Sequence, residues 1–370
     1  MKKWNINYIN HLRNVFVNRL HNATDMTEQH RIIKSLESID RIIKATEKTS
    51  FSSLTSKVTH MAILEEDSLL FTQFGYYCPY IRILQSYYDL VEIKTENYKR
   101  LFPTDDSLIH FSKSFYSHVG GKFKEAFTDI AMRFDKTLRI GNAYISKKCS
   151  GSTYNVYGTK VAFIDFNKTG TIQDYLSINH ETSHAISIQM NSRAFWDSEK
   201  YCFKEVDSLF FEMLTLDTLD NEFDDEALKV KLDTFNDYLY SAEILGAKMD
   251  LLNEFSSFKL VDKKAIINYL LDNGYDKQAI SDILSESSVN LFDYVISYLT
   301  AIELYFIYEV DKNLALSILE KIIMCNKDNR NDYLDYVKSL GINPGDNLDK
   351  YVGHLMNQSK KDNYIYEKTI

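Results

Sequence analysis

The chain has 370 residues, 45% of them hydrophobic and 14% aromatic, which is the composition of a globular protein and not of a disordered one. Its formal net charge is −9 and no basic stripe stands out, so the charge pattern argues against nucleic acid as a partner. Only 12 glycines and 3 prolines occur, a scarcity that favours long helices over a sandwich or barrel with many turns.

The sequence shows no targeting signal. Lysines near the start are not followed by an apolar h-region, so we expect no secretory signal. No apolar run approaches the length of a membrane span, so we expect no membrane partner. The cysteines are scattered without a CxxC pair, as is typical of free thiols in a reducing cytosol. These features predict a cytoplasmic protein whose four cysteines are reduced: Cys78, Cys149, Cys202 and Cys325.

The first third of the chain is predicted to be helical. Apolar residues recur at helical spacing in two stretches within residues 1–48, and again over residues 58–101 with a break near Pro79. The run Phe102 to Asp106 is the clearest linker signal. We therefore expect an N-terminal helical region over residues 1–105 and a catalytic domain over residues 106–370.

The next stretch contains the one strand that the pattern predicts. Residues 107–140 are again predicted to be helical, and residues 141–154 carry the glycines and serines of loops. Lys160 to Phe166 has the composition of a strand. Thr171 and Asp174 then form a plausible capping box for the helix that follows.

The remainder is predicted to be helical as well. One of these helices is rich in tyrosine, and no internal repeat is present. The predicted helices cover residues 233–254, 263–271, 277–284, 291–310, 314–324 and 331–340. The pattern as a whole indicates a mainly helical fold with a small β element.

The stretch that carries chemistry is the HExxH run from His180 to His184. Two histidines four residues apart lie on one face of a helix, one turn from each other. Glu205 follows His184 by 21 residues and would supply a carboxylate as the third ligand. Two imidazoles and a carboxylate make a catalytic zinc site with one open position, and Glu181 would be the general base beside it.

The alternative is that the two histidines are surface or core residues hydrogen-bonded to carboxylates. Three features favour the metal site: the motif lies on a capped helix, a second amphipathic helix carries Glu205, and a strand precedes the motif. Glu212 lies two helical turns after Glu205, on the same face, and could hold a ligating histidine from outside the ligand set. It could equally be a solvent-facing charge.

The span from about Arg139 to Leu216 resembles the oligoendopeptidase F branch of the thimet oligopeptidase family. The resemblance rests on Gly141 to Tyr144, the strand, the HExxH helix, and a Glu-x-x-Ser-x-x-x-Glu pattern that begins at Glu205. It implies a mainly α, zincin-like (neurolysin-like) catalytic domain with a small β-sheet beside the HExxH helix. It also implies one zinc ion per chain and hydrolysis of internal bonds in short peptides.

The resemblance also implies further site residues. A tyrosine of the tyrosine-rich helix would stabilise the oxyanion; Tyr298 fits the family pattern best and Tyr294 second, although either could be structural. The predicted strand would offer its edge to an extended peptide, or would simply be a core strand. Tyrosines of the preceding loop could cover the substrate. The predicted substrate contacts are Tyr154, Tyr157, Ala162, Phe163 and Ile164.

The sequence departs from the family in three places. Thr182-Ser183 replaces a pair that usually ends in Gly, Ser187 stands where the family often has a histidine, and the connector to Glu205 is short. Two rival functions stay open: a maturation protease dedicated to one leader or signalling peptide, and a zinc-binding but inactive peptide-binding protein. The Glu205-to-Glu212 pattern and the tyrosine-rich helix disfavour a thermolysin-like enzyme or an aminopeptidase. The oligomeric state is not predicted.

Overall fold

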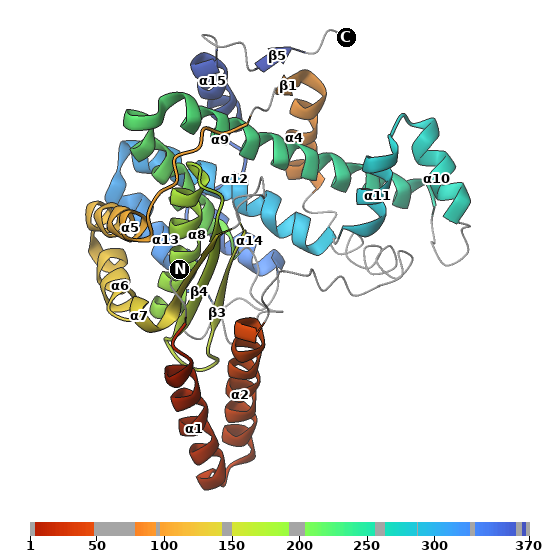
Figure 1. Ribbon diagram of the computed structural model, residues 1–370. Helices are drawn as coiled ribbons and strands as arrows, with labels where there is room; N and C mark the ends of the chain where they lie inside the picture. The colour runs from red at the N-terminus through yellow and green to blue at the C-terminus, as the bar shows by residue number, and fades with distance from the viewer. Residues whose placement is uncertain are drawn as a thin grey trace. The chain divides into compact units, whose positions relative to one another are not determined.

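A computed structural model describes most of the chain (Figure 1): residues 4–47, 78–93, 97–142, 150–191, 204–255, 263–286, 288–325, 330–359 and 365–367. The chain divides into two compact units, each assembled from separate segments. The first contains residues 1–51, 97–227 and 307–340, and the second contains residues 52–96, 228–306 and 341–370. The predicted boundary after residue 105 lies inside the first unit, so a division into a helical region and a catalytic domain stays a prediction.

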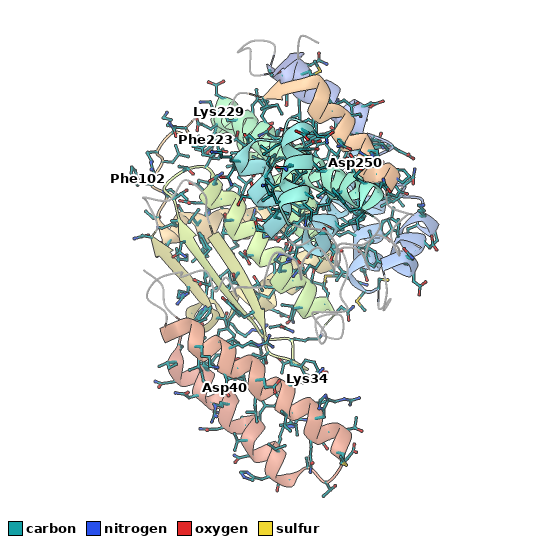
Figure 2. All side chains as sticks on the ribbon, turned by 90° about the vertical axis from the view of Figure 1, so that its right-hand side faces the viewer. Lys34, Asp40, Phe102, Phe223, Lys229 and Asp250 are labelled. Atoms are coloured by element: carbon teal, nitrogen blue, oxygen red, sulfur yellow. The ribbon has the colours of Figure 1, made fainter. Side chains whose placement is uncertain are left out.

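The first unit begins with a helical hairpin of α1 (Ile6–Asn22) and α2 (Met26–Glu47). Asn5 caps α1, because its side chain accepts a hydrogen bond from the Tyr8 N–H. The hairpin packs its apolar face onto the sheet, in one core cluster with Phe163. Its outer face is charged, with Lys34 and Asp40 on α2 visible in Figure 2. The two helices predicted within residues 1–48 are confirmed.

The sheet of the first unit has three strands in the order β2-β4-β3. Strand β4 (Ala162–Lys168) pairs in parallel with β2 (Leu138–Asn142) and antiparallel with β3 (Ser150–Asn155). The predicted strand is confirmed as β4. The predicted helix up to residue 140 and the predicted loop up to residue 154 are wrong where β2 and β3 lie, because neighbours in the sheet stabilise segments whose own composition is not strand-like.

Helices α7 (Phe134–Thr137) and α8 (Gln173–Met190) contact this sheet, and α5 (Asp105–Val119) and α6 (Gly121–Ala131) pack on α8. Helix α8 contacts β3 and β4 on one side and α5 and α6 on the other (Figure 1). Its apolar residues Ile178, Ala185 and Ile188 are fully buried between these layers. The helix that carries the HExxH motif is therefore held on both sides.

Helix α8 begins at a tightly bonded turn. The Asp174 carboxylate accepts hydrogen bonds from the backbone N–H groups of Thr169 and Gly170, at 2.7 and 2.9 Å. Thr171 Oγ1 accepts a longer bond, 3.3 Å, from the Gln173 N–H. The predicted pair therefore does act at this terminus, but Asp174 reaches further back than a capping box requires, and the helix itself begins at Gln173.

Helix α9 (Val206–Glu254) begins one residue after Glu205 and has 49 residues. Its backbone leaves helical geometry at Phe223, which Figure 2 labels, and residues up to 227 belong to the first unit. Helices α13 (Lys312–Ile323) and α14 (Arg330–Ser339) complete this unit. The C-terminal end of α8 is tied to α13, because Asn191 Nδ2 donates a 2.7 Å hydrogen bond to the Ile323 carbonyl.

The second unit contains α4 (Cys78–Leu90), α10 (Lys263–Asp272), α11 (Lys277–Ser285), α15 (Leu348–Ser359) and the first part of α12 (Ser288–Val310). Strand β1 (Val91–Ile93) pairs antiparallel with β5 (Ile365–Glu367). The predicted helix over residues 58–101 is confirmed only as α4: it ends at Leu90, and residues 58–77 lie outside the described part.

One described helical segment, Asn290–Val310, is long and apolar enough to cross a membrane by length and composition, which corrects the expectation that no apolar run approaches that length. In the structure 67% of its most apolar window is buried, a pattern that the core helix of a globular protein also produces. The absence of a membrane partner stays a prediction.

Candidate metal centre

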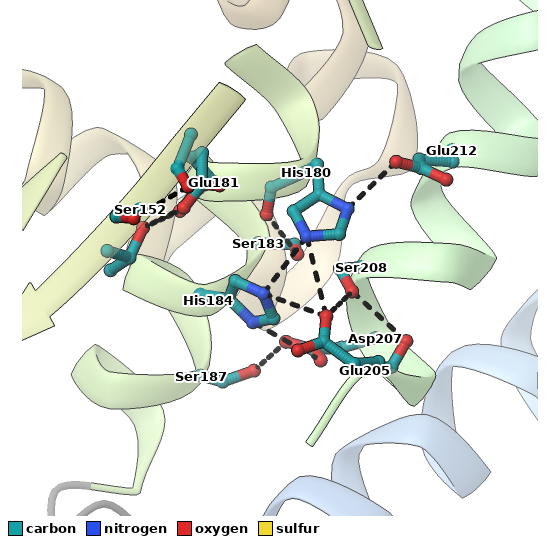
Figure 3. A network of polar contacts seen from close by, with 12 residues as sticks. Ser152, His180, Glu181, Ser183, His184, Ser187, Glu205, Asp207, Ser208 and Glu212 are labelled. Carbon is teal, nitrogen blue, oxygen red and sulfur yellow. Dashed lines mark hydrogen bonds and ion pairs between the residues drawn. The ribbon is translucent and has the colours of Figure 1, made fainter. Parts of the chain in front are cut away.

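Three predicted ligands meet in the first unit (Figure 3). His180 and His184 lie one turn apart on α8, and their Nε2 atoms are 3.2 Å from each other. Glu205, at the start of α9, brings its Oε2 atom to 3.4 Å from His180 Nε2 and 3.1 Å from His184 Nε2. Glu205 follows His184 by 21 positions, and the intervening residues connect the histidines within α8 to the start of α9.

The spacing of these ligand atoms fits a small tetrahedral cation. Zinc bonds to nitrogen and oxygen are about 2.0–2.1 Å long, which separates two ligand atoms of a tetrahedron by roughly 3.3 Å. The separations of 3.1–3.4 Å found here agree with that value. The donor set, two imidazoles and one carboxylate, is also one that zinc prefers in catalytic sites. The three side chains therefore fit a zinc ion.

The surroundings of the two histidines stabilise positive charge. Burial alone would lower the pKa of His180, but the carboxylates of Glu212 and Glu205 outweigh it and raise that pKa well above its ordinary value. Burial likewise opposes the charged form of His184, and Glu205 is the main group that raises its pKa. Against its own burial, Glu205 has a pKa well below the usual range because of these histidines. The cluster accommodates either protons or a cation.

Two further carboxylates lie behind the histidines. Glu212 Oε1 is 2.8 Å from His180 Nδ1, the ring nitrogen that faces away from the ligand cluster. The structure thus brings Glu212 to the histidine as the helical spacing suggested. Asp207 Oδ1 lies 3.9 Å from His184 Nδ1. The sequence reasoning did not assign Asp207 to the site, since its only signal is its place two residues after Glu205.

Glu181 is almost fully buried and lies on the side of α8 that faces β3, away from the histidine rings (Figure 3). The Thr153 hydroxyl lies 2.7 Å from its Oε2 atom and 2.8 Å from its carbonyl oxygen. Burial raises the pKa of Glu181 above that of an ordinary carboxyl group, against the lowering effect of His180 and His184. A raised pKa moves a carboxylate toward the range in which general bases operate.

The close approach of β3 to Glu181 requires a glycine. A Cβ atom on Gly151 would lie 2.7 Å from both Cγ and Cδ of Glu181, which is closer than real carbon atoms come. The sequence predicts a loop at Gly151 and Thr153, and only the pairing of β3 with β4 brings them beside the motif.

The predicted peptide-binding strand is wrong in its position. Strand β4 is the central strand, so Ile164 pairs with Leu138 on one side and Thr153 on the other. Its carbonyl oxygen accepts a 2.8 Å hydrogen bond from Trp4 Nε1. The side chains of the three predicted contacts are buried in the core: Ala162, Phe163 and Ile164. A strand with neighbours on both sides has no free backbone groups to pair with a peptide.

The structure places the two predicted cover tyrosines at β3 and the β3–β4 turn, and their substrate-covering role stays a prediction. Tyr154 lies on β3, with its ring edge-on to Trp4 at a centroid distance of 5.7 Å. Tyr157 belongs to the turn between β3 and β4, and its ring lies 5.6 Å from Lys34 Nζ. The backbone of Tyr157 is bonded to Ser35 and Ser38 of α2, whereas Tyr154 packs in the core cluster that Trp4 shares with the hairpin.

The two candidate oxyanion donors lie in the second unit, on α12. Tyr298 is 1% exposed, and its ring stacks on Tyr238 with centroids 3.9 Å apart and planes 6° from parallel. Tyr294 is 40% exposed. The stacking gives Tyr298 a packing role within its unit, and a catalytic role for either tyrosine stays a prediction.

The departures from the family motif fit the helix. Thr182 and Ser183 are both fully buried within α8, and Ser183 Oγ donates a 2.6 Å hydrogen bond to the His180 carbonyl. A small hydroxyl side chain is thus accommodated where glycine would otherwise allow close packing. Most of the short connector, residues 192–203, and the predicted entry residues Ala143 and Tyr144 lie outside the described part.

Comparison of the sequence with protein-family models and with curated proteins gives no match. Several solved structures are similar. A structure described as an oligoendopeptidase F from Bacillus anthracis str. Ames has a TM-score of 0.52 and 14% sequence identity, over 90% of this chain and 64% of that one. PZ peptidase A with inhibitor 2 has a TM-score of 0.51 and 15% identity, over 90% of this chain and 65% of that one.

A peptidase structure from Chlamydophila abortus has a TM-score of 0.50 and 14% identity, over 95% of this chain and 62% of that one. This chain spans less than two thirds of the length of each of these three solved chains. The likeness shows the fold, and it confirms the predicted mainly α, zincin-like architecture with a small sheet beside the HExxH helix.

Proposed function

We propose that this chain, which has the fold of the oligoendopeptidase F structures, is a zinc-dependent endopeptidase that hydrolyses internal bonds of short peptides. The observation that carries the proposal is the meeting of His180, His184 and Glu205, at separations that fit one tetrahedral zinc ion, on a helix that also carries Glu181. One zinc ion per chain follows from this single three-residue cluster among the described residues.

The chemistry divides between the ion and the side chains. A bound zinc ion supplies a Lewis acid that activates water and polarises a peptide carbonyl. Glu181 is the general base: its carboxylate takes a proton from the attacking water and later delivers it to the leaving amine. Its burial favours this role because a raised pKa makes the carboxylate a stronger base and brings its pKa closer to the working pH of a group that takes up and returns a proton.

The outer contacts keep the ligands in place. Glu212 Oε1 lies 2.8 Å from His180 Nδ1 and would accept its proton, which would leave Nε2 free to bind an ion. Ser208 Oγ lies 2.9 Å from Glu205 Oε2 and orients that carboxylate in the same way. The ligand geometry is therefore set before an ion arrives, which lowers the cost of binding it.

The proposal includes a short peptide as substrate, no nucleic-acid or membrane partner, and action in the cytoplasm. The net charge of −9 supports the absence of a nucleic-acid partner. The scattered cysteine positions without a CxxC pair support the reducing compartment, and Cys325, the cysteine whose side chain the structure describes, is buried.

The test pairs metal analysis with mass-spectrometric digestion of a mixed peptide pool by the wild-type chain and by Glu181→Gln. We expect one equivalent of zinc in both proteins and internal cuts by the wild type alone. Gln keeps the shape of the side chain and loses its basicity, so the variant also controls for contaminating peptidases.

Other outcomes distinguish the rivals. Zinc in both proteins without cuts by either would favour a protease dedicated to one leader or signalling peptide, or a zinc-binding but inactive peptide-binding protein. Equal cutting by both would remove Glu181 from the role of base. No zinc in either would sink the metallopeptidase proposal.

A further inference from the structure

Asp207 is a buried carboxylate that the proposed chemistry does not use. It is 3% exposed and lies in the first turn of α9, two residues after the ligand Glu205. Its Oδ2 atom accepts a hydrogen bond from Ser187 Oγ, and the Ser208 N–H also donates to this carboxylate. A carboxylate is expensive to bury beside another one, so its presence here calls for a cationic or proton-donating partner.

The polar group that faces its other oxygen is His184 Nδ1. That nitrogen is buried and has no hydrogen-bond partner among the described residues. Asp207 Oδ1 lies 3.9 Å away, about 1 Å beyond the usual length of an N–H···O bond. On the opposite side of the ring, Nε2 faces Glu205 and His180 in the ligand cluster.

The other histidine shows what the completed contact looks like. His180 Nδ1 lies 2.8 Å from Glu212 Oε1, within hydrogen-bond length, while its Nε2 faces the same ligand cluster. A histidine that binds a metal through Nε2 carries its proton on Nδ1, and that proton needs an acceptor. Each histidine therefore needs an acceptor for its Nδ1 proton, and each has one carboxylate of α9 near that nitrogen: Glu212 for His180 and Asp207 for His184.

We propose that Asp207 is a positioning residue for His184: it accepts the Nδ1 proton, fixes the tautomer that leaves Nε2 free for zinc, and is itself held by Ser187. This inference rests on the proposed zinc site. It assigns a function to Ser187, which lies three residues after His184 and so on the same face of α8. One helix supplies both the ligand and the group that orients its carboxylate partner.

The experiment measures the zinc dissociation constant of the full chain by competition with a chromophoric chelator. The variants are Asp207→Asn, Ser187→Ala and, as a matched control, Glu303→Gln. Glu303 is an equally buried carboxylate, 4% exposed, whose partner in the structure is Asn347 and not a histidine. Far-UV circular dichroism and melting temperature in chelator establish that each variant folds without metal.

We expect Asp207→Asn to weaken zinc binding by about 10–100-fold, Ser187→Ala to weaken it less, and Glu303→Gln to leave it unchanged. The absorption spectrum of the cobalt-substituted protein provides a second readout. It should change in Asp207→Asn and not in the control, because a reoriented ligand alters the metal's geometry whereas lost packing elsewhere does not.

A folded Asp207→Asn protein with wild-type zinc affinity and cobalt spectrum would overturn the positioning role and leave the zinc peptidase proposal standing. If that variant does not fold, Ser187→Ala decides: weakened binding supports the role and unchanged binding overturns it. Failure of the wild-type chain to bind zinc would instead overturn the proposed function, and this inference with it.

Discussion

The metal centre of the first unit and the tyrosine-lined core of the second are both buried, yet they are built on opposite principles. In the metal centre, two histidines are surrounded by carboxylates, and every ring nitrogen faces an acidic oxygen or another ligand. Around Tyr298 the contacts are ring against ring, with Tyr238 stacked on one face and Tyr351 edge-on. The first arrangement is balanced by a cation or by protons, whereas the second consists mainly of contacts between aromatic rings.

The difference teaches how far a residue type identifies a function. A histidine pair with carboxylates at fixed spacing has few purely structural uses, because burying those charges without a cation or protons is costly. A tyrosine on an apolar helix is as useful for packing as for catalysis. The same chain therefore carries one site that its motif predicts specifically and one candidate whose role the residue type leaves open.

The largest effects should come from truncating one central side chain in each region, His184 in the metal centre and Tyr298 in the aromatic core. We expect His184→Ala to weaken zinc binding by more than the roughly 100-fold that an outer partner can contribute, with the metal-free fold retained. Tyr298→Ala should instead keep the zinc site and lose about 3–5 kcal/mol of stability, because it empties a stacked core position. Chelator competition and chemical denaturation measure the two. If His184→Ala kept its zinc affinity, the two regions would no longer differ in metal binding.

A smaller effect should follow at the contact between β3 and the proposed base. Gly151→Ala forces the Glu181 side chain to move, so we expect kcat to fall by about 100-fold and zinc content to stay at one equivalent. Gly353→Ala is the matched control, since a Cβ there meets nothing within 4 Å on helix α15. Peptide cleavage at wild-type rate by Gly151→Ala would show that Glu181 tolerates displacement.

The ionisable groups of the metal centre should also make the stability of the metal-free wild-type protein depend on pH. Because the folded-state pKa values of His180 and His184 are raised, their protonation stabilises the fold below about pH 6.5, and this stability is lost as pH rises toward the raised values. Glu181 and Asp207, whose pKa values are also raised, act in the same direction from lower pH. The lowered pKa of Glu205 acts only below about pH 4.5.

We therefore expect the melting temperature in chelator to fall as the pH rises above about 6.5, by roughly 1–2 °C for each kcal/mol lost in a chain of this length. Zinc should abolish the fall, because the ion replaces the protons and its binding is favoured at higher pH. Differential scanning fluorimetry across this range checks both curves. A melting temperature in chelator that rises with pH would contradict the electrostatic description of the cluster.

The smallest effect is expected from Tyr298→Phe, which keeps the stacked ring and removes only the hydroxyl. We expect a stability change of less than about 1 kcal/mol and a kcat within a few-fold of wild type, as for a packing residue. A fall in kcat of about 100–1,000-fold with unchanged zinc content would instead establish Tyr298 as the oxyanion donor. Tyr294→Phe, at the more exposed position, provides the comparison.

The sequence predicted what depends on local spacing. The placing of His180 with His184, and of Glu205 with Glu212, on one helix face follows from the 3.6-residue period, whereas Glu205 was assigned as a ligand from its distance after the motif. It failed where position depends on partners elsewhere in the chain. Strand β3, Ser150–Asn155, has the composition of a loop and is a strand only because β4 pairs with it.

The prediction that β4 offers an edge to a peptide failed for the same reason. Whether a strand is central or at an edge is a property of the sheet's order, and no residue of β4 records that β2 pairs on its other side. Asp207 was missed because a single acidic residue at the start of a helix is common, and only the three-dimensional position of His184 gives it a role.

Gly151 has a consequence for how sequences of this kind diverge. Many core side chains can be replaced by others of similar size during evolution. At position 151, however, even alanine would displace Glu181. We expect descendants of a common ancestor to retain a glycine, followed two positions later by a hydroxyl residue such as Thr153, at a fixed remove before HExxH. This short pattern would identify homologous proteins whose overall sequence identity is no higher than that of unrelated sequences.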